Sequence, residues 1–71
     1  MFDYSKLCGR IVEKFGTRKA FCVAAEVTES WLAARLGGKI QFRADEMHHI
    51  ARLLDFPVDQ IPVYFFTPKL R

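Results

Sequence analysis

The stretch GTRKAFCVAAEVTESWLAARLGGK, near the middle of the chain, constrains the fold more than any other part of the sequence. Thr17 and Thr28 are both suited to begin a helix, because a threonine hydroxyl at the N-cap accepts a hydrogen bond from an amide of the first turn. The pair Gly37-Gly38 is suited to end the second helix, since glycine adopts the left-handed backbone found at helix ends. The pattern therefore predicts two short helices, at about 18–25 and 28–36, joined by a tight turn.

Apolar residues at helical spacing predict further helices on both sides of this pair. In residues 4–15, Leu7, Ile11 and Phe15 recur at intervals of four and share one face. A helix at about 44–54 has its own apolar stripe, which consists of Met47, Ile50, Leu53 and Leu54. The sequence thus predicts an all-α fold, a compact unit of four to five short helices that forms a single domain over residues 1–71.

The second helix is expected to turn Ala20, Phe21 and Ala24 inward, because small residues allow a crossing helix to approach closely.

The end of the chain is expected to be only partly helical. Pro57 favours a short helical turn that Pro62 ends, since proline has a fixed φ and lacks the amide hydrogen that a helix interior needs. Residues 63–66 are then expected to form a short extended C-terminal segment, which is apolar, before a polar tail at 67–71.

Positive charge is concentrated around the two central helices. The whole chain has a net charge of +3, whereas residues 10–43 alone hold seven basic and three acidic side chains, a net of +4. Such a distribution suits contact with the phosphates of a nucleic acid, although it also fits an ordinary solvated helical surface.

The composition and the pattern of apolar residues exclude other classes of protein. With 51% hydrophobic and 27% charged residues, the chain has a globular composition. No apolar run approaches the roughly 20 residues of a membrane span, and no signal peptide opens the chain, so we expect a cytoplasmic protein that does not enter a membrane. Cys8 and Cys22 are too few for a disulfide framework and are expected to be reduced, partly buried thiols.

Little in the sequence indicates catalysis or a metal centre. His48 and His49 are adjacent on a helix, so they point about 100° apart and cannot share a metal ion as a pair four residues apart does. No nucleophile with a base and an acid, and no phosphate-binding glycine loop, can be assembled. We therefore expect no enzyme activity, no cofactor, no metal and no small-molecule substrate.

The two central helices, at about 17–37, have the layout of a helix-turn-helix, whose second helix enters the major groove of DNA. Residues near the amino-terminal end of that helix read the bases, while basic side chains and helix starts bind phosphates. The residues expected to face the bases are Glu29, Ser30, Trp31 and Ala34. The residues expected to bind phosphates are Thr17, Arg18, Lys19, Lys39 and Arg43.

Trp31 is open to two interpretations. If exposed, it would stack on Arg35 one turn later or lie along a sugar. If turned inward, it would belong to the core or to a surface that contacts a partner.

Several motifs carry a resemblance to known proteins. The central segment resembles the lambda-repressor-like helix-turn-helix family, and four further stretches resemble the short Cro-type regulators of phages and prophages in Gram-positive bacteria. These stretches are MFDYSKL, KFGT-x-KAF, LLD-x-P and YFFTPK. The resemblance implies a five-helix repressor-like fold and a transcriptional regulator that binds operator sites in double-stranded DNA, usually as a homodimer, inside the bacterial host cell.

The sequence also departs from the pattern of that family. Arg18 stands where glutamine is common, and Glu26 stands at the turn position, where a left-handed backbone would cost a residue other than glycine about 1 kcal/mol. Arg43 stands where a capping serine would suit Glu46, three residues later. Trp31 and its alanine neighbours replace residues that are usually small and polar or basic. The scaffold is therefore better retained than the surface that would read DNA.

An alternative function follows from these departures. The chain would then be a repressor-like protein-interaction module, an antirepressor or modulator that docks on another regulator through Trp31 and the apolar tail Tyr64–Phe66. The affinity for DNA should fall steeply with salt. For each phosphate neutralised, log K should fall by about 0.9 per tenfold rise in salt concentration. Protein docking should depend far less on salt and should fail with Trp31→Ala. Homodimerisation through the tail is compatible with either function.

Overall fold

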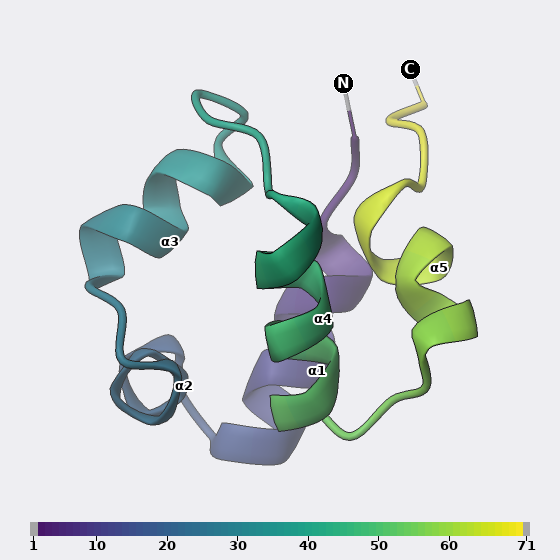
Figure 1. Cartoon of the computed structure of the whole chain (residues 1–71). Helices are drawn as coiled ribbons and strands as arrows, with labels where there is room; N and C mark the ends of the chain where they lie inside the picture. Colours follow the sequence, from purple (N-terminus) through teal and green to yellow (C-terminus); the bar gives the residue numbers. More distant parts are fainter. Residues whose placement is uncertain (1, 71) are drawn as a thin grey trace.

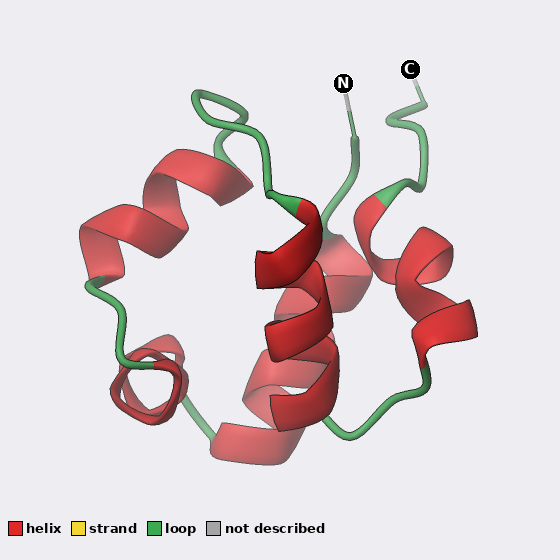
Figure 2. Ribbon diagram, in the orientation of Figure 1, coloured by secondary structure: helices red, strands yellow, loops and turns green. Residues whose placement is uncertain are grey.

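The computed structural model describes residues 2–70, and five α-helices follow one another along this part of the chain (Figure 1). The helices are α1 (Ser5–Phe15), α2 (Arg18–Ala25), α3 (Glu29–Leu36), α4 (Ala44–Leu53) and α5 (Ile61–Phe65), with the short 3-10 helix η1 (Val58–Gln60) directly before α5. Residues 2–70 form no strand, as the colours of Figure 2 show, and the predicted all-α fold is confirmed. None of these helices is both long and apolar enough to cross a membrane.

The two predicted threonine caps are present. The Thr17 hydroxyl accepts a hydrogen bond of 3.0 Å from the amide of Ala20, and the Thr28 hydroxyl accepts one of 3.0 Å from the amide of Trp31. Both threonines have the extended backbone of an N-cap residue. α2 and α3 therefore begin at the residues that the sequence predicts.

α2, α3 and α4 are each followed, within two residues, by a residue with a left-handed backbone. Gly38 follows α3 with a φ of 83°, as the glycine pair predicts. Glu26 follows α2 with a φ of 61°, and Asp55 follows α4 with a φ of 62°. In each case the amide of the next residue donates to a carbonyl in the last turn of the helix, which satisfies a carbonyl that would otherwise lack a partner.

The core is formed mainly by aliphatic and aromatic side chains from all five helices. The largest fully buried side chains are Leu7, Ile11, Phe21, Leu32, Ile50, Leu54 and Phe65. The predicted apolar stripe of α1 is confirmed for Leu7 and Ile11, which are inaccessible to solvent.

The inward face of α2 differs from the predicted one. Phe21 is buried as expected, but its buried neighbours are Cys22 and Ala25, whereas Ala20 and Ala24 are exposed. Residues four apart share a helix face, so burying Phe21 brings Ala25 inward with it. The prediction that Ala20 and Ala24 face the core is therefore wrong.

Phe42, in the loop between α3 and α4, links distant parts of the core. Its ring meets those of Tyr4, Trp31 and Phe65 edge to face, with centroid separations of 5.3, 6.2 and 5.0 Å. Such edge-to-face pairs are a favoured geometry for aromatic rings. Through Phe42, α3 is packed to α5 and to the start of the chain.

The C-terminal part of the chain is more helical than predicted. Pro62 lies in the first turn of α5, where an amide hydrogen is not needed, so the helix continues through it rather than ending there. Residues 63–65 are helical, and the extended segment begins only after Phe65. This segment lies beside the start of the chain, where the amide of Asp3 donates to the carbonyl of Thr67 at 2.7 Å (Figure 1). Residue 71, the end of the predicted polar tail, lies outside the described residues.

Candidate functional site

An ion pair between Arg35 and Glu46 joins α3 to α4. The Nε atom of Arg35 donates to one carboxylate oxygen of Glu46 at 3.0 Å, and an Nη atom donates to the other at 3.1 Å. The two side chains are only 10% and 18% exposed. A planar guanidinium that binds both oxygens of a carboxylate fixes orientation as well as distance, so this pair sets how α3 lies against α4.

Glu46 also holds the start of α4. Its carboxylate accepts a hydrogen bond of 2.9 Å from the amide of Arg43, as the three-residue spacing predicts. Burial by itself would raise the pKa of Glu46. The hydrogen bonds from Arg35 and from the Arg43 amide outweigh this effect and lower the pKa below the ordinary carboxyl value. Glu46 is therefore charged and fully engaged within the protein.

Trp31 is half-buried and held on two sides. The guanidinium carbon of Arg35 lies 4.0 Å from the centre of its ring, and the edge-to-face contact with Phe42 ties it to the core. The sequence offered stacking on Arg35 and contact with the core as alternatives, and the structure contains both. Because Arg35 is itself fixed by Glu46, the indole has little freedom to turn outward.

The other residues expected to face DNA bases differ in exposure. Glu29 and Ser30 are exposed in the first turn of α3, whereas Ala34 is half-buried. Two of the four expected residues are therefore exposed, and the other two are half-buried.

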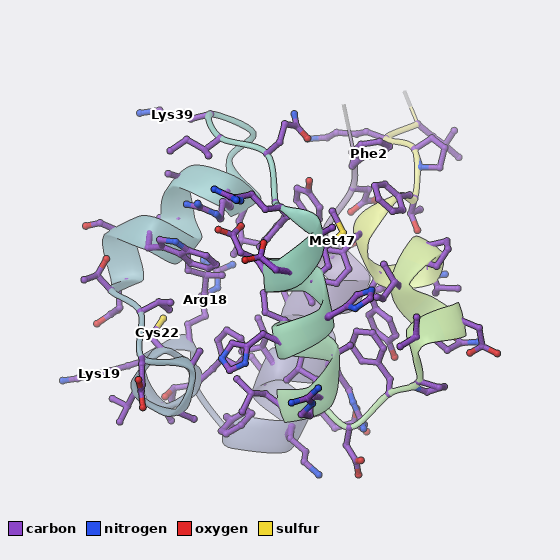
Figure 3. All side chains as sticks on the ribbon, in the orientation of Figure 1. Phe2, Arg18, Lys19, Cys22, Lys39 and Met47 are labelled. Carbon is purple, nitrogen blue, oxygen red and sulfur yellow. The ribbon has the colours of Figure 1, made fainter. Side chains whose placement is uncertain are left out.

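The residues expected to bind phosphates are not brought together into one cluster. Lys19 and Lys39 are exposed and lie toward opposite ends of α3, as their labels in Figure 3 show. An Nη atom of Arg18 donates weakly to the Cys8 sulfur at 3.5 Å. Arg43 pairs with Asp45 at 3.6 Å. Thr17, the fifth member of the set, uses its hydroxyl as the cap of α2.

A pocket of about 290 Å³ opens beside Trp31, between the α2–α3 turn and α4. We call it the Trp31 pocket. Its apolar lining consists of Ala25, Val27, Trp31 and Ile50, and its polar lining consists of Asp45, Glu46 and His49. The pocket is at the low end of the range of about 300–1,000 Å³ for small-molecule sites, so it is suited to a partner's side chain.

Sequence reasoning did not find the pairing of Arg35 with Glu46 or the pocket that it borders. The only signal in the sequence was the position of Glu46 three residues after Arg43, which indicates a cap but not a partner on another helix. The sequence favoured a surface or half-buried role for His49 over a metal site but did not indicate a pocket, whereas the structure places it in the wall of the pocket.

The two thiols are free, as predicted. Cys8 is half-buried and Cys22 is buried. Burial raises the pKa of the Cys22 thiol, and the charge of Glu29 raises it further, so this thiol is protonated and packs as a small apolar side chain.

Comparison with known proteins places this small all-helical chain in a family. Residues 1–68 match the family described as "Protein of unknown function (DUF739)", and the chain belongs to that family. It is also similar to the solution structure of the modulator of repression (MOR) of the temperate bacteriophage TP901-1 from Lactococcus lactis. The sequences are 34% identical, the TM-score is 0.83, and the match covers 99% of this chain and 95% of that one. Comparison with curated proteins found no match. Neither description names a Cro-type regulator.

Proposed function

We propose that this protein is a modulator of repression that acts by binding a repressor protein, rather than a Cro-like repressor that reads operator DNA. The observation that carries the proposal is the similarity to the TP901-1 modulator, which extends over nearly the whole length of both chains. The regulator-docking alternative from the sequence is therefore preferred over the DNA-reading function.

The geometry of α3 supports this choice. Trp31, at a position expected to face bases, is clamped between Arg35 and Phe42. The residues before and at the start of α3 include two exposed acids, Glu26 and Glu29, which repel phosphates. An interface with another protein tolerates both features, since aromatic side chains and charged rims are common in such interfaces.

The two apolar regions that the sequence suggested for docking are separate in the structure. α3 and α5 lie on opposite sides of α4 in Figure 1. In the Tyr64–Phe66 tail, Phe65 is buried, Tyr64 stacks on Phe56 with a centroid separation of 4.1 Å, and only Phe66 is exposed, at 42%. We therefore assign the docking surface to the Trp31 side of the molecule.

Binding to the repressor encoded in the same genome tests the proposal, measured by isothermal titration calorimetry. We expect a complex, and we expect Ser30→Arg to weaken it, because the longer side chain would stand beside Trp31 on the exposed part of α3. Val58→Arg, on exposed η1, is the matched control and should bind like the parent. A repressor that shows no heat of binding to the parent protein would contradict the proposal.

One observation favours DNA binding as a second candidate function. Lys19 and Lys39 are exposed near the two ends of α3, where they would reach phosphates on either side of a groove. Gel shifts with duplex DNA from the adjacent intergenic region, at two salt concentrations, separate the two functions. A DNA-binding protein would lose about 0.9 log units of affinity per phosphate contact for each tenfold rise in salt. Ser30→Arg would then strengthen DNA binding while it weakens the protein complex.

A further inference from the structure

Resting on the proposed function, we propose that the Trp31 pocket is a subsite for one basic side chain, an arginine or a lysine, of the partner protein. The occupant follows from the lining of the pocket, which combines an apolar interior with acidic groups at its edge. Arg35, the nearest arginine on α3, is already engaged by Glu46.

The apolar lining suits the stem of such a side chain. Ala25 contributes from the end of α2, Val27 from the α2–α3 turn and Ile50 from α4, and the indole of Trp31 forms a wall. The methylene groups of lysine and arginine bury readily against apolar surface while their charged ends stay near water or a counter-ion.

The counter-ion for the charged end is Asp45. This residue lines the pocket and is 78% exposed, so its carboxylate is reachable from solvent. Its ion pair with Arg43 is 3.6 Å long and joins two side chains that are both about three-quarters exposed. Pairs of this kind contribute little to stability, about 0–1 kcal/mol, so a cation from a partner can replace Arg43 at little cost.

Two further acids are neighbours in the chain of residues that line the pocket. Glu26 lies in the chain between Ala25 and Val27, and Glu29 lies two residues before Trp31. Both are exposed, and no ion pair joins either of them to another residue within 2–70.

The charges near the pocket favour a cation over an anion or a neutral group. Of the two acids that line the pocket, Glu46 is neutralised by Arg35, whereas Asp45 is held only by its exposed pair with Arg43. Glu46 does not take part directly, since both of its oxygens are engaged by Arg35 and one of them also by the Arg43 amide. The exposed carboxylate of Asp45 would repel an acidic side chain.

Tryptophan fluorescence tests the proposal directly, because Trp31 is the only tryptophan of the chain. The probe is an acetylated and amidated alanine-rich peptide with an arginine at every fourth position. We expect it to change the emission of Trp31 in a saturable manner. A peptide of the same length with glutamine in place of arginine should leave the emission unchanged. An equal response to the two peptides, or no response to either, would overturn the proposal.

Charge-neutralising variants locate the site. Asp45→Asn should weaken binding of the arginine peptide about fivefold, which is an ordinary loss for one exposed charge pair. Asp59→Asn, which removes the same charge from exposed η1, should bind like the parent. Equal affinities of Asp45→Asn and Asp59→Asn would overturn the assignment to this pocket.

The same variants separate this inference from the proposed function. If the parent binds the repressor and Asp45→Asn binds it as tightly, the subsite is wrong while the proposed function stands. If the parent fails to bind the repressor but binds the arginine peptide with the expected dependence on Asp45, the proposed function is wrong and the subsite stands.

Discussion

Arg35 and Glu46 are joined by two parallel hydrogen bonds, of 3.0 and 3.1 Å, which bridge α3 and α4. Because the two side chains are only 10% and 18% exposed, water cannot replace a lost partner easily. The same guanidinium covers one face of Trp31. This one pair therefore stabilises the fold and also fixes the wall of the candidate docking pocket.

Arg35→Met should lower the free energy of unfolding by about 3 kcal/mol, because it leaves the Glu46 carboxylate poorly solvated and unpaired. The double variant Arg35→Met/Glu46→Leu should recover most of this loss, apart from about 1 kcal/mol for the missing hydrogen bond to the Arg43 amide. Urea unfolding of the parent, both single variants and the double variant gives the coupling energy. Strictly additive effects would show that the pair does not act as a unit.

The stability of the protein should fall in acid because of Glu46. Its pKa in the folded protein is lowered from the ordinary value of 4.5, so the contribution of its charge to stability is complete above that value. The contribution is lost as the pH falls through the lower pKa of the folded state. Urea unfolding at a series of pH values should therefore show a smaller acid-induced loss in Glu46→Gln than in the parent. Some loss should remain, because hydrogen bonds from Ser5 also lower the pKa of Asp3.

Glu26→Gly should raise the free energy of unfolding by about 0.5–1 kcal/mol. The left-handed backbone at this position strains any residue with a Cβ, and glycine adopts it freely. Glu29→Gly is the matched control, since it makes the same exchange at an exposed helical position and should lower the free energy by about 0.5–1 kcal/mol. Thermal unfolding of the two variants should shift in opposite directions, and a shift in the same direction would contradict the assigned backbone.

Thr28→Ala should destabilise the protein by about 1 kcal/mol, because the amide of Trp31 loses its hydrogen-bond acceptor at the start of α3. Thr28→Ser retains a hydroxyl in the same place and should remain close to the parent. Chemical denaturation measures both variants. A serine variant as unstable as the alanine variant would mean that the methyl group, rather than the cap, matters at this position.

The local signals in the sequence predicted the helices well. The caps at Thr17 and Thr28 and the glycine pair after α3 each depend on hydrogen bonds between residues a few positions apart, and the structure contains all three. Proline was ambiguous, because the missing amide hydrogen that would end a helix also suits its first turn. Pro62 takes the second role and lies in the first turn of α5.

Part of the candidate site could also be predicted from local spacing. Trp31 and Arg35 lie four residues apart on one helix, so their stacking was one of two foreseeable arrangements. The other arrangement, contact with the core, is also present, because Phe42 folds back from the following loop.

The amino-acid pattern alone thus determined where α2, α3 and α4 begin and that the chain forms an all-α unit, since caps and periodicity act within a turn or two. Only the tertiary structure decided that α2 turns Phe21, Cys22 and Ala25 inward, that Arg35 meets Glu46, and that a pocket opens beside Trp31. The physical reason is that these features depend on how helices cross, and a crossing is set by side-chain packing between residues far apart in the chain.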